Sequence, residues 1–230
     1  MRKGLATLAI IAGLTAGCAA PPPRPTEPAD QGPANFPAQQ YLSAISRGEP
    51  VFRIDPAQSV VVIEVRRAGS LARLGHDHVV ASHDLRGYAA PREGRADLYV
   101  PLDRLVVDEP ELRAEAGFDT VPSESDIAGT RRNMLTRVLD VDRYPFALVA
   151  ISGVVPGTGD PVASVELTLN GTTRTMRVPL QITSGSGDIA VSGHLALKQT
   201  DFGIVPLSIL GGAIQVEDEV KLHFEIRAHR

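Results

Sequence analysis

Two histidines stand two positions apart in the chain, at His76 and His78, with Asp77 between them. If this stretch is a β-strand, His76 and His78 point to the same face and Asp77 points to the other. Three roles fit such a pair: binding a metal ion, forming a polar gate that bonds the head group of a ligand, and bonding loop backbone structurally. The residues alone leave all three open.

A metal site needs more ligands than this pair supplies. Zinc sites in proteins take three or four protein ligands, and two histidines provide two. His83 has the wrong strand parity, whereas His194 and His223 fall on the polar faces of their predicted strands. His76 and His78 are therefore weak metal candidates, and the sequence predicts no bound metal.

Nothing in the chain has the spacing of a catalytic site. Gly185-Ser186-Gly187 is too short for a nucleophile elbow. Paired carboxylates, a P-loop and a dinucleotide fingerprint are also missing from the sequence. We therefore predict a protein that is not an enzyme and has no catalytic residues and no cofactor.

The first residues resemble the signal of a bacterial lipoprotein. Met1 to Lys3 is a short basic region, an apolar run follows to Leu14, and Cys18 is the only cysteine. An apolar run this short does not span a bilayer. The resemblance predicts a signal peptide at residues 1–17, lipidation of Cys18 and a membrane partner. Ala19 after the cysteine favours the periplasmic face of the outer membrane in the cell envelope; the alternative is a soluble periplasmic protein.

The rest of the chain divides into a tether and one domain. Residues 18–50 are rich in proline, alanine and small polar residues, which predicts an extended tether. Residues 51–230 are predicted to form a single folded domain. The net charge of −4 argues against a nucleic-acid partner.

Alternating apolar residues predict that this domain is mainly β. The pattern is clearest at residues 59–65, 95–100, 165–169, 189–197 and 220–226, and Asn170-Gly171 predicts a tight hairpin. Helices are predicted at 110–116 and at 123–139, where Ser123 and Asp126 suit a capping box, and residues 41–47 are compatible with one helical turn. A closed antiparallel β-barrel suits strands with one apolar face and leaves no exposed edge.

Five short motifs in this order resemble the YceI-like family of bacterial envelope proteins. The motifs are Phe52-Arg53-Ile54-Asp55 with Ser59, Gly75-His76, Val141-Asp142-Arg143-Tyr144-Pro145, Leu167-Thr168-Leu169-Asn170-Gly171, and Thr200-Asp201-Phe202-Gly203-Ile204. The resemblance covers about Val51 to Ala228. It implies a lipocalin-like barrel of about eight strands with a helical insertion. It also implies an interior tunnel that binds an isoprenoid-like lipid, of polyisoprenoid or quinone type, for carriage or sequestration in the envelope.

On this hypothesis several residues are candidates for contact with the lipid. The tunnel candidates are Phe146, Phe202, Ile204, Leu207 and Ile209, and the candidates at the mouth are His76 and His78. A packed core uses the same residue types as an apolar pocket, so Phe202 and Phe146 also suit a structural role. The alternatives are a metal-binding envelope protein that uses His76 and His78, and a structural or interaction module with a solid core. A homo-oligomer is compatible with each.

Overall fold

The computed structural model describes residues 32–155 and 160–230. The predicted signal peptide, Cys18 and the first part of the predicted tether lie outside these residues. Residues 32–230 form one compact unit. Among the described residues, none of the helices has the length and apolar character needed to span a bilayer.

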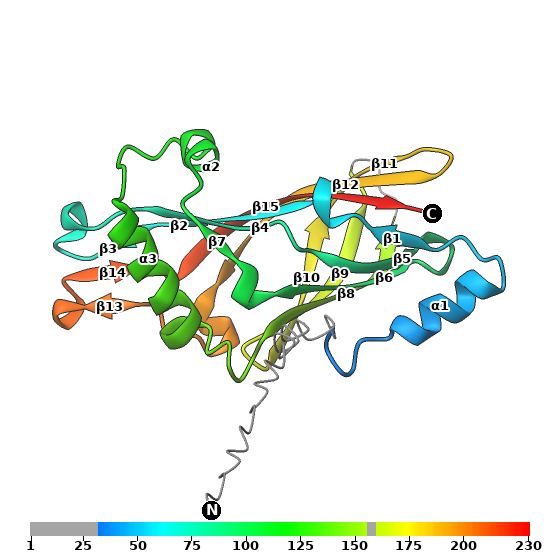
Figure 1. Cartoon of the computed structure of the whole chain (residues 1–230), viewed down its shortest axis with the longest axis horizontal. Helices are drawn as coiled ribbons and strands as arrows, with labels where there is room; N and C mark the ends of the chain where they lie inside the picture. The colour runs from blue at the N-terminus through cyan, green and yellow to red at the C-terminus, as the bar shows by residue number, and fades with distance from the viewer. Residues whose placement is uncertain (1–31, 156–159) are drawn as a thin grey trace, which may run out of the picture. The chain divides into compact units, whose positions relative to one another are not determined.

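Twelve antiparallel strands form the main sheet (Figure 1). They are β1 (Phe52–Ile54), β2 (Val60–Val65), β4 (His78–Ser82), β5 (Arg86–Ala90), β6 (Arg95–Pro101), β7 (Val106–Val107), β8 (Phe146–Val155), β9 (Val162–Leu169), β10 (Thr172–Pro179), β11 (Gln181–Ser184), β12 (Asp188–Lys198) and β15 (Glu219–His229). The path of neighbours runs β10-β9-β8-β6-β5-β1-β15-β2-β4-β7, and β12 joins β15 to β11. The prediction of a mainly β antiparallel fold is confirmed.

The predicted hairpin at Asn170-Gly171 joins β9 to β10. Both residues have positive φ angles, 50° and 70°. Such a turn twists in the same sense as its two strands, so it sets their register. Leu169 accordingly pairs with Thr172, and the ladder continues to Val162 and Pro179.

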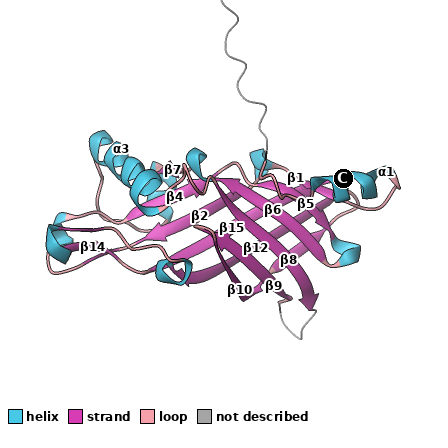
Figure 2. Cartoon of the chain, turned by 90° about the horizontal axis from the view of Figure 1, so that it is seen from below, coloured by secondary structure: helices cyan, strands magenta, loops and turns pink. Residues whose placement is uncertain are grey.

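The expected closed barrel of about eight strands is not what the structure shows. Within residues 32–155 and 160–230, no backbone ladder joins β10 to β12, and the sheet has more strands than expected. The reason lies at Leu180, where the strand segment changes partners: Pro179 still pairs with β9, whereas Gln181 pairs with Ser192 of β12. The chain itself therefore links the two ends of the curled sheet, which Figure 2 shows from below.

A second, smaller sheet lies at one end of the large one. It consists of β3 (Arg67–Ala68), β13 (Ser208–Ile209) and β14 (Ile214–Val216), in the order β13-β14-β3. Gly69 packs so tightly against the backbone of Ala213 that a side chain would collide with it. This contact and the hydrogen bond from Leu71 N to Ala213 O hold the two loops of the small sheet together.

Helices occupy few of the described residues. They are α1 (Ala38–Ser46), α2 (Pro110–Glu115), α3 (Glu124–Asn133) with a π-helical turn at Met134–Val138, and 3-10 turns at Pro56–Gln58, Ala72–Leu74, Pro91–Glu93, Leu102–Arg104, Gln199–Phe202 and Leu210–Gly212. The predicted capping box is confirmed: Ser123 and Asp126 exchange hydrogen bonds at the start of α3. The helical insertion thus lies between β7 and β8, as the sequence indicates.

Helix α1 falls inside the stretch predicted to be an extended tether. It docks on the sheet because Tyr41 and Ala44 are buried against Val51 and Ala90. The ring of Tyr41 stacks on Tyr88 at 5.3 Å, and its hydroxyl donates to Asp97 at 2.6 Å. A single aromatic anchor with a polar partner therefore orders a segment whose composition is that of a linker.

Candidate functional site

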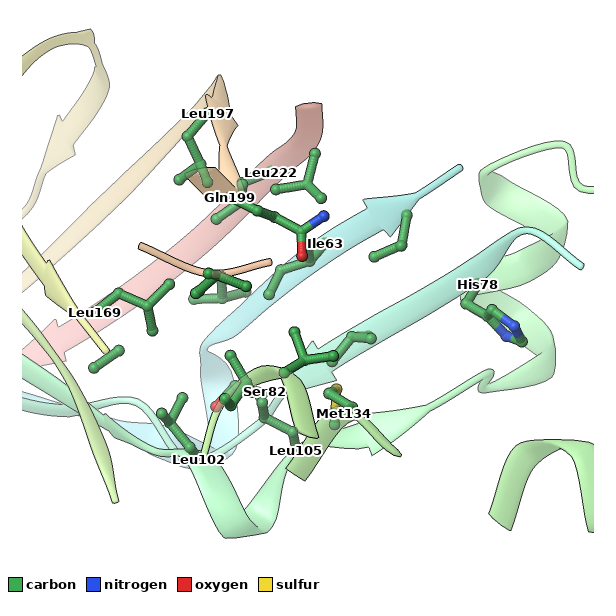
Figure 3. A pocket seen from close by; sticks show the side chains of 18 of the residues that line it. Ile63, His78, Ser82, Leu102, Leu105, Met134, Leu169, Leu197, Gln199 and Leu222 are labelled. Atoms are coloured by element: carbon green, nitrogen blue, oxygen red, sulfur yellow. The ribbon is translucent and has the colours of Figure 1, made fainter. Parts of the chain in front are cut away.

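The curled sheet encloses a cavity of about 580 Å³. Its wall is built by alternate residues of each strand, which the period of two directs to one face. Strand β9 contributes Val165, Leu167 and Leu169, β2 contributes Val61, Ile63 and Val65, and β15 contributes Val220, Leu222, Phe224 and Ile226. Figure 3 shows Ile63, Leu102, Leu169 and Leu222 around this space. The wall is therefore almost wholly aliphatic.

Helix α3 and its π-turn cover one end of the cavity. One face of the helix lines it, at positions spaced by one helical turn: Ser125, Asp126, Gly129, Thr130, Asn133 and Met134. The helix is fixed by Arg131, whose guanidinium donates to the carbonyl of Leu105 at 3.3 Å and to that of Asp103 at 2.5 Å. Polar side chains are thus concentrated at this end.

The cavity opens between α3 and the small sheet. Four of its lining residues are classed as exposed, namely Ser125 and Asp126 of α3, Ile209 of β13 and Gln215 of β14. Both elements stand at the same end of the domain in Figure 1. An apolar chain that enters here meets polar groups at the mouth and aliphatic side chains beyond them.

His78 is held by a buried acid behind the mouth. Its Nδ1 lies 2.6 Å from Oδ2 of Asp108, whose side chain has no solvent exposure. Asp108 also accepts from the backbone N–H of Val79 and from Arg113, at 3.1 and 2.5 Å. Burial raises the pKa of the Asp108 carboxyl, but its hydrogen bond to His78, the charge of His78 and the donors Val79 and Arg113 together lower it below its ordinary value. The carboxylate is therefore ionised and fixes the ring of His78.

His76 differs from His78 in having an unsatisfied nitrogen. Its Nδ1 is buried and has no hydrogen-bond partner among the described residues. The two rings meet edge to face, with centroids 6.2 Å apart, and Nε2 of His78 lies 3.4 Å from the hydroxyl of Thr130. A buried nitrogen without a partner is destabilising unless a water molecule or a ligand bonds it.

No group of three His, Cys, Asp or Glu residues suited to a metal ion occurs in residues 32–155 and 160–230. Asp108 already occupies Nδ1 of His78. Among the described residues, His76 and His78 therefore have no third metal ligand, as the sequence also indicates.

The structure brings together five of the residues proposed from the sequence. His76, His78, Ile204, Leu207 and Ile209 all line the cavity. Whether they contact a ligand stays a prediction.

The two phenylalanines do not line the cavity. Phe202 is buried in the core, and Gly203 beside it has a φ of 70°, which is the structural role considered for this motif. Phe146 lies on the opposite face of β8 from the lining residues Ala147 and Val149, and it packs edge to face on Tyr99.

The sequence does not predict that some residues contact His78 near the mouth. Asp108 and Thr130 are 30 and 52 positions from His78, and no local spacing connects them. The only sequence feature that singles out Asp108 is its position just before Glu109-Pro110, where a helix is expected to begin.

Comparison with known proteins identifies the fold. Two solved structures are similar: a polyisoprenoid binding domain from Saccharophagus degradans implicated in plant cell wall breakdown, and BcnA of Burkholderia cenocepacia. The first is 14% identical in sequence, with a TM-score of 0.54, and the match covers 77% of this chain and 97% of that structure. The second is 16% identical, with a TM-score of 0.55, and the match covers 76% of this chain and 98% of that structure. Comparison with curated protein sequences finds no match.

The model of one domain family matches almost the whole folded unit. This is the YceI-like domain, and the match runs over residues 52–228, from the first strand to the last. It includes the strands that form the cavity wall and the histidines at its mouth. The protein belongs to the YceI-like family.

Proposed function

We propose that this protein binds one long apolar lipid of the isoprenoid type inside the sheet. The observation that carries the proposal is the aliphatic cavity of about 580 Å³, which is within the usual size range of small-molecule sites. Burying hydrocarbon contributes about 0.8 kcal/mol for each methylene, so a long chain needs few polar contacts to bind.

The distribution of polar groups gives the lipid an orientation. Polar side chains gather beside α3, and the wall along β9 and β15 is apolar. The hydrocarbon chain would therefore lie along the strands, and a polar head would remain at the mouth beside His76. A head that hydrogen-bonds there satisfies the buried Nδ1 atom.

Two further features support the lipid as ligand. The chain is a member of the YceI-like family, and a polyisoprenoid binding domain has the same fold. A polyisoprenoid or a quinone with such a tail suits the cavity. Its carriage or sequestration in the cell envelope, with the protein anchored through Cys18 at the outer membrane, remains part of the proposal.

The alternatives have less support. A structural module with a solid core is at odds with the cavity. A metal site at His76 and His78 has no third ligand among the described residues.

Extraction of the purified protein tests the proposal. The protein is prepared from cell envelopes without added lipid, extracted with organic solvent and analysed by mass spectrometry. We expect an isoprenoid lipid in near-stoichiometric amount. Protein that yields no lipid, and takes up none when a long isoprenoid alcohol is added, would overturn the proposal.

A further inference from the structure

We propose that the small sheet beside the cavity mouth is a docking surface for a lipid bilayer with anionic head groups. The inference rests on the proposed function, because it supplies the step by which a water-insoluble lipid reaches the cavity. It is carried by exposed apolar side chains, by charge and by one strained residue. Arg73, Leu74, Val205 and Leu210, on which it mainly depends, do not line the cavity that carries the proposed function.

The two loops of the small sheet expose large apolar side chains to solvent. Leu74, after β3, is 61% exposed; Val205 and Leu210, on either side of β13, are 79% and 70% exposed. Ile209, which lines the mouth, lies next to Leu210. The sheet ladder between β14 and β3 holds the loops that carry Leu74 and Leu210 side by side at one end of the domain (Figure 1), whereas Val205 precedes β13.

Leu210 has a backbone conformation that disfavours a leucine. Its φ is 51°, and Gly211 and Gly212 after it also have positive φ angles. A glycine would meet no steric resistance at such a position, whereas a bulky side chain is strained there. The strained residue is also 70% exposed, which points to a function for its side chain rather than for the turn.

The charge of these loops suits an anionic surface. Residues 66–74 and 205–216 contain three arginines and no acidic residue, in a protein of net charge −4. Arg66 and Arg67 are paired with carboxylates, which reduces their contribution. Arg73 is exposed, beside Leu74, and has no carboxylate partner among the described residues. An unpaired arginine beside an exposed leucine adds one favourable charge contact with an anionic membrane surface.

A bilayer explains the position of the surface better than a protein partner does. Leu74 and Leu210 stand on loops beside the cavity mouth, where Ile209 and Gln215 of the small sheet lie among the exposed residues of the described cavity wall, together with Ser125 and Asp126 of α3. Loops inserted at the interface would give the lipid an apolar path from the bilayer into the cavity, with its chain shielded from water throughout.

Flotation with vesicles tests the inference. The probe is the full chain carrying Cys18→Ala, so that a lipid anchor cannot contribute, mixed with vesicles of phosphatidylethanolamine and phosphatidylglycerol. We expect binding, and we expect Leu74→Ser with Leu210→Gly to weaken it by on the order of tenfold or more. The same double variant should unfold at an unchanged or higher temperature, because glycine relieves the strain at position 210.

A matched control uses the other end of the domain. Leu42 and Ile45 of α1 are 45% and 46% exposed, and Leu42→Ser with Ile45→Ser removes as many exposed apolar residues there. This control should bind vesicles as the parent does. Equal loss in both double variants, or no vesicle binding by the parent, would overturn the docking surface. If the parent does not bind vesicles, the exposed apolar residues of the small sheet would instead be assigned to contact with a protein.

Two further measurements test the contribution of Arg73 and the lipid content of the cavity. Arg73→Gln should weaken binding to vesicles with phosphatidylglycerol and leave the weaker binding to phosphatidylcholine vesicles unchanged; an equal effect on both contradicts the electrostatic part. Mass spectrometry of the same proteins separates the two proposals. Lipid in the cavity without vesicle binding contradicts docking alone, whereas vesicle binding without lipid contradicts the proposed function alone.

Discussion

Nδ1 of His78 lies 2.6 Å from Oδ2 of Asp108, which joins the cavity mouth to a fully buried carboxylate. Asp108 has a φ of 61°, a left-handed conformation that aspartate and asparagine tolerate better than other residues with side chains. Its second oxygen accepts from Arg113, which also donates to the carbonyls of Asp77 and Thr120. One acid thus connects β4, the end of β7 and α2.

Asp108→Asn should destabilise the fold while preserving the backbone conformation. Arg113 would lose a buried ionic partner, and we expect a loss of about 3 kcal/mol in the free energy of unfolding at pH 7. Urea denaturation measures it. Asp119→Asn is the control: Asp119 is exposed in its pair with Arg67, so its loss should stay below about 0.5 kcal/mol. Equal small effects would contradict the role of Asp108.

The effect of Asp108 should also depend on pH. Folding lowers the pKa of its carboxyl, so the stabilisation is complete above the unfolded value of about 3.9 and is lost as pH falls through the lower, folded value. The difference between the parent and Asp108→Asn should therefore be largest at neutral pH and shrink below about pH 4. A difference that stays constant down to pH 2 would contradict this linkage.

Tyr41→Phe should loosen α1. Burial, the hydrogen bond to Asp97 and the negative charge of Asp97 raise the pKa of the Tyr41 hydroxyl far above its ordinary value. The stabilisation is therefore complete below the unfolded pKa of about 10 and is lost as pH rises beyond it. We expect the free energy of unfolding of the variant to be about 2 kcal/mol lower at pH 7, because the hydroxyl bonds a charged group. The fall in stability of the parent above about pH 10 should be absent from the variant.

The control for this prediction is Tyr88→Phe. Tyr88 stacks on the same ring, but its hydroxyl has no hydrogen bond among the described residues. Its removal should change the free energy of unfolding by less than about 0.5 kcal/mol. Limited proteolysis near residue 37 should be faster only in Tyr41→Phe. If both variants behave alike, the bond to Asp97 does not anchor the helix.

Leu167→Trp should displace the lipid by filling the cavity. The side chain of Leu167 lines the cavity, and a larger ring would occupy the space needed by the hydrocarbon chain. We expect the amount of lipid that co-purifies to fall at least about tenfold, since each excluded methylene forfeits about 0.8 kcal/mol. Glu166→Trp places the same ring on the exposed face of β9 and should leave the lipid content unchanged. Lipid loss in both variants would point to misfolding instead.

The sequence predicts the site where local periodicity decides, and it fails where the tertiary fold decides. Strand parity alone separates Phe146 from the cavity wall, because Ala147 and Val149 face inward and Phe146 has the opposite parity. The alternation along β8 therefore predicts that Phe146 does not line the cavity. Phe202 gives no such signal, because it lies in a 3-10 turn whose burial depends on packing against distant residues.

Sheet closure is a second feature that periodicity does not determine. Alternation predicts an apolar face but not which strands meet at the ends of the sheet. Here the chain changes partners at Leu180, so that β10 pairs with β9 and β11 pairs with β12, at opposite ends of the sheet. The docking of α1 likewise depends on Tyr41 and Asp97, two residues 56 positions apart.

The unsatisfied nitrogen of His76 leads to the last prediction. If a polar lipid head bonds its buried Nδ1, His76→Leu should weaken binding of a long isoprenoid alcohol by about tenfold, the effect of losing one hydrogen bond. Binding of the corresponding hydrocarbon, which has no hydroxyl, should be unchanged or tighter, because leucine removes a buried polar atom from the mouth. Competition with a fluorescent lipid measures both affinities in the same protein. Equal weakening of the two ligands would mean that His76 only shapes the mouth, whereas a selective loss of the alcohol would place the head group at this atom and the hydrocarbon chain along the strands.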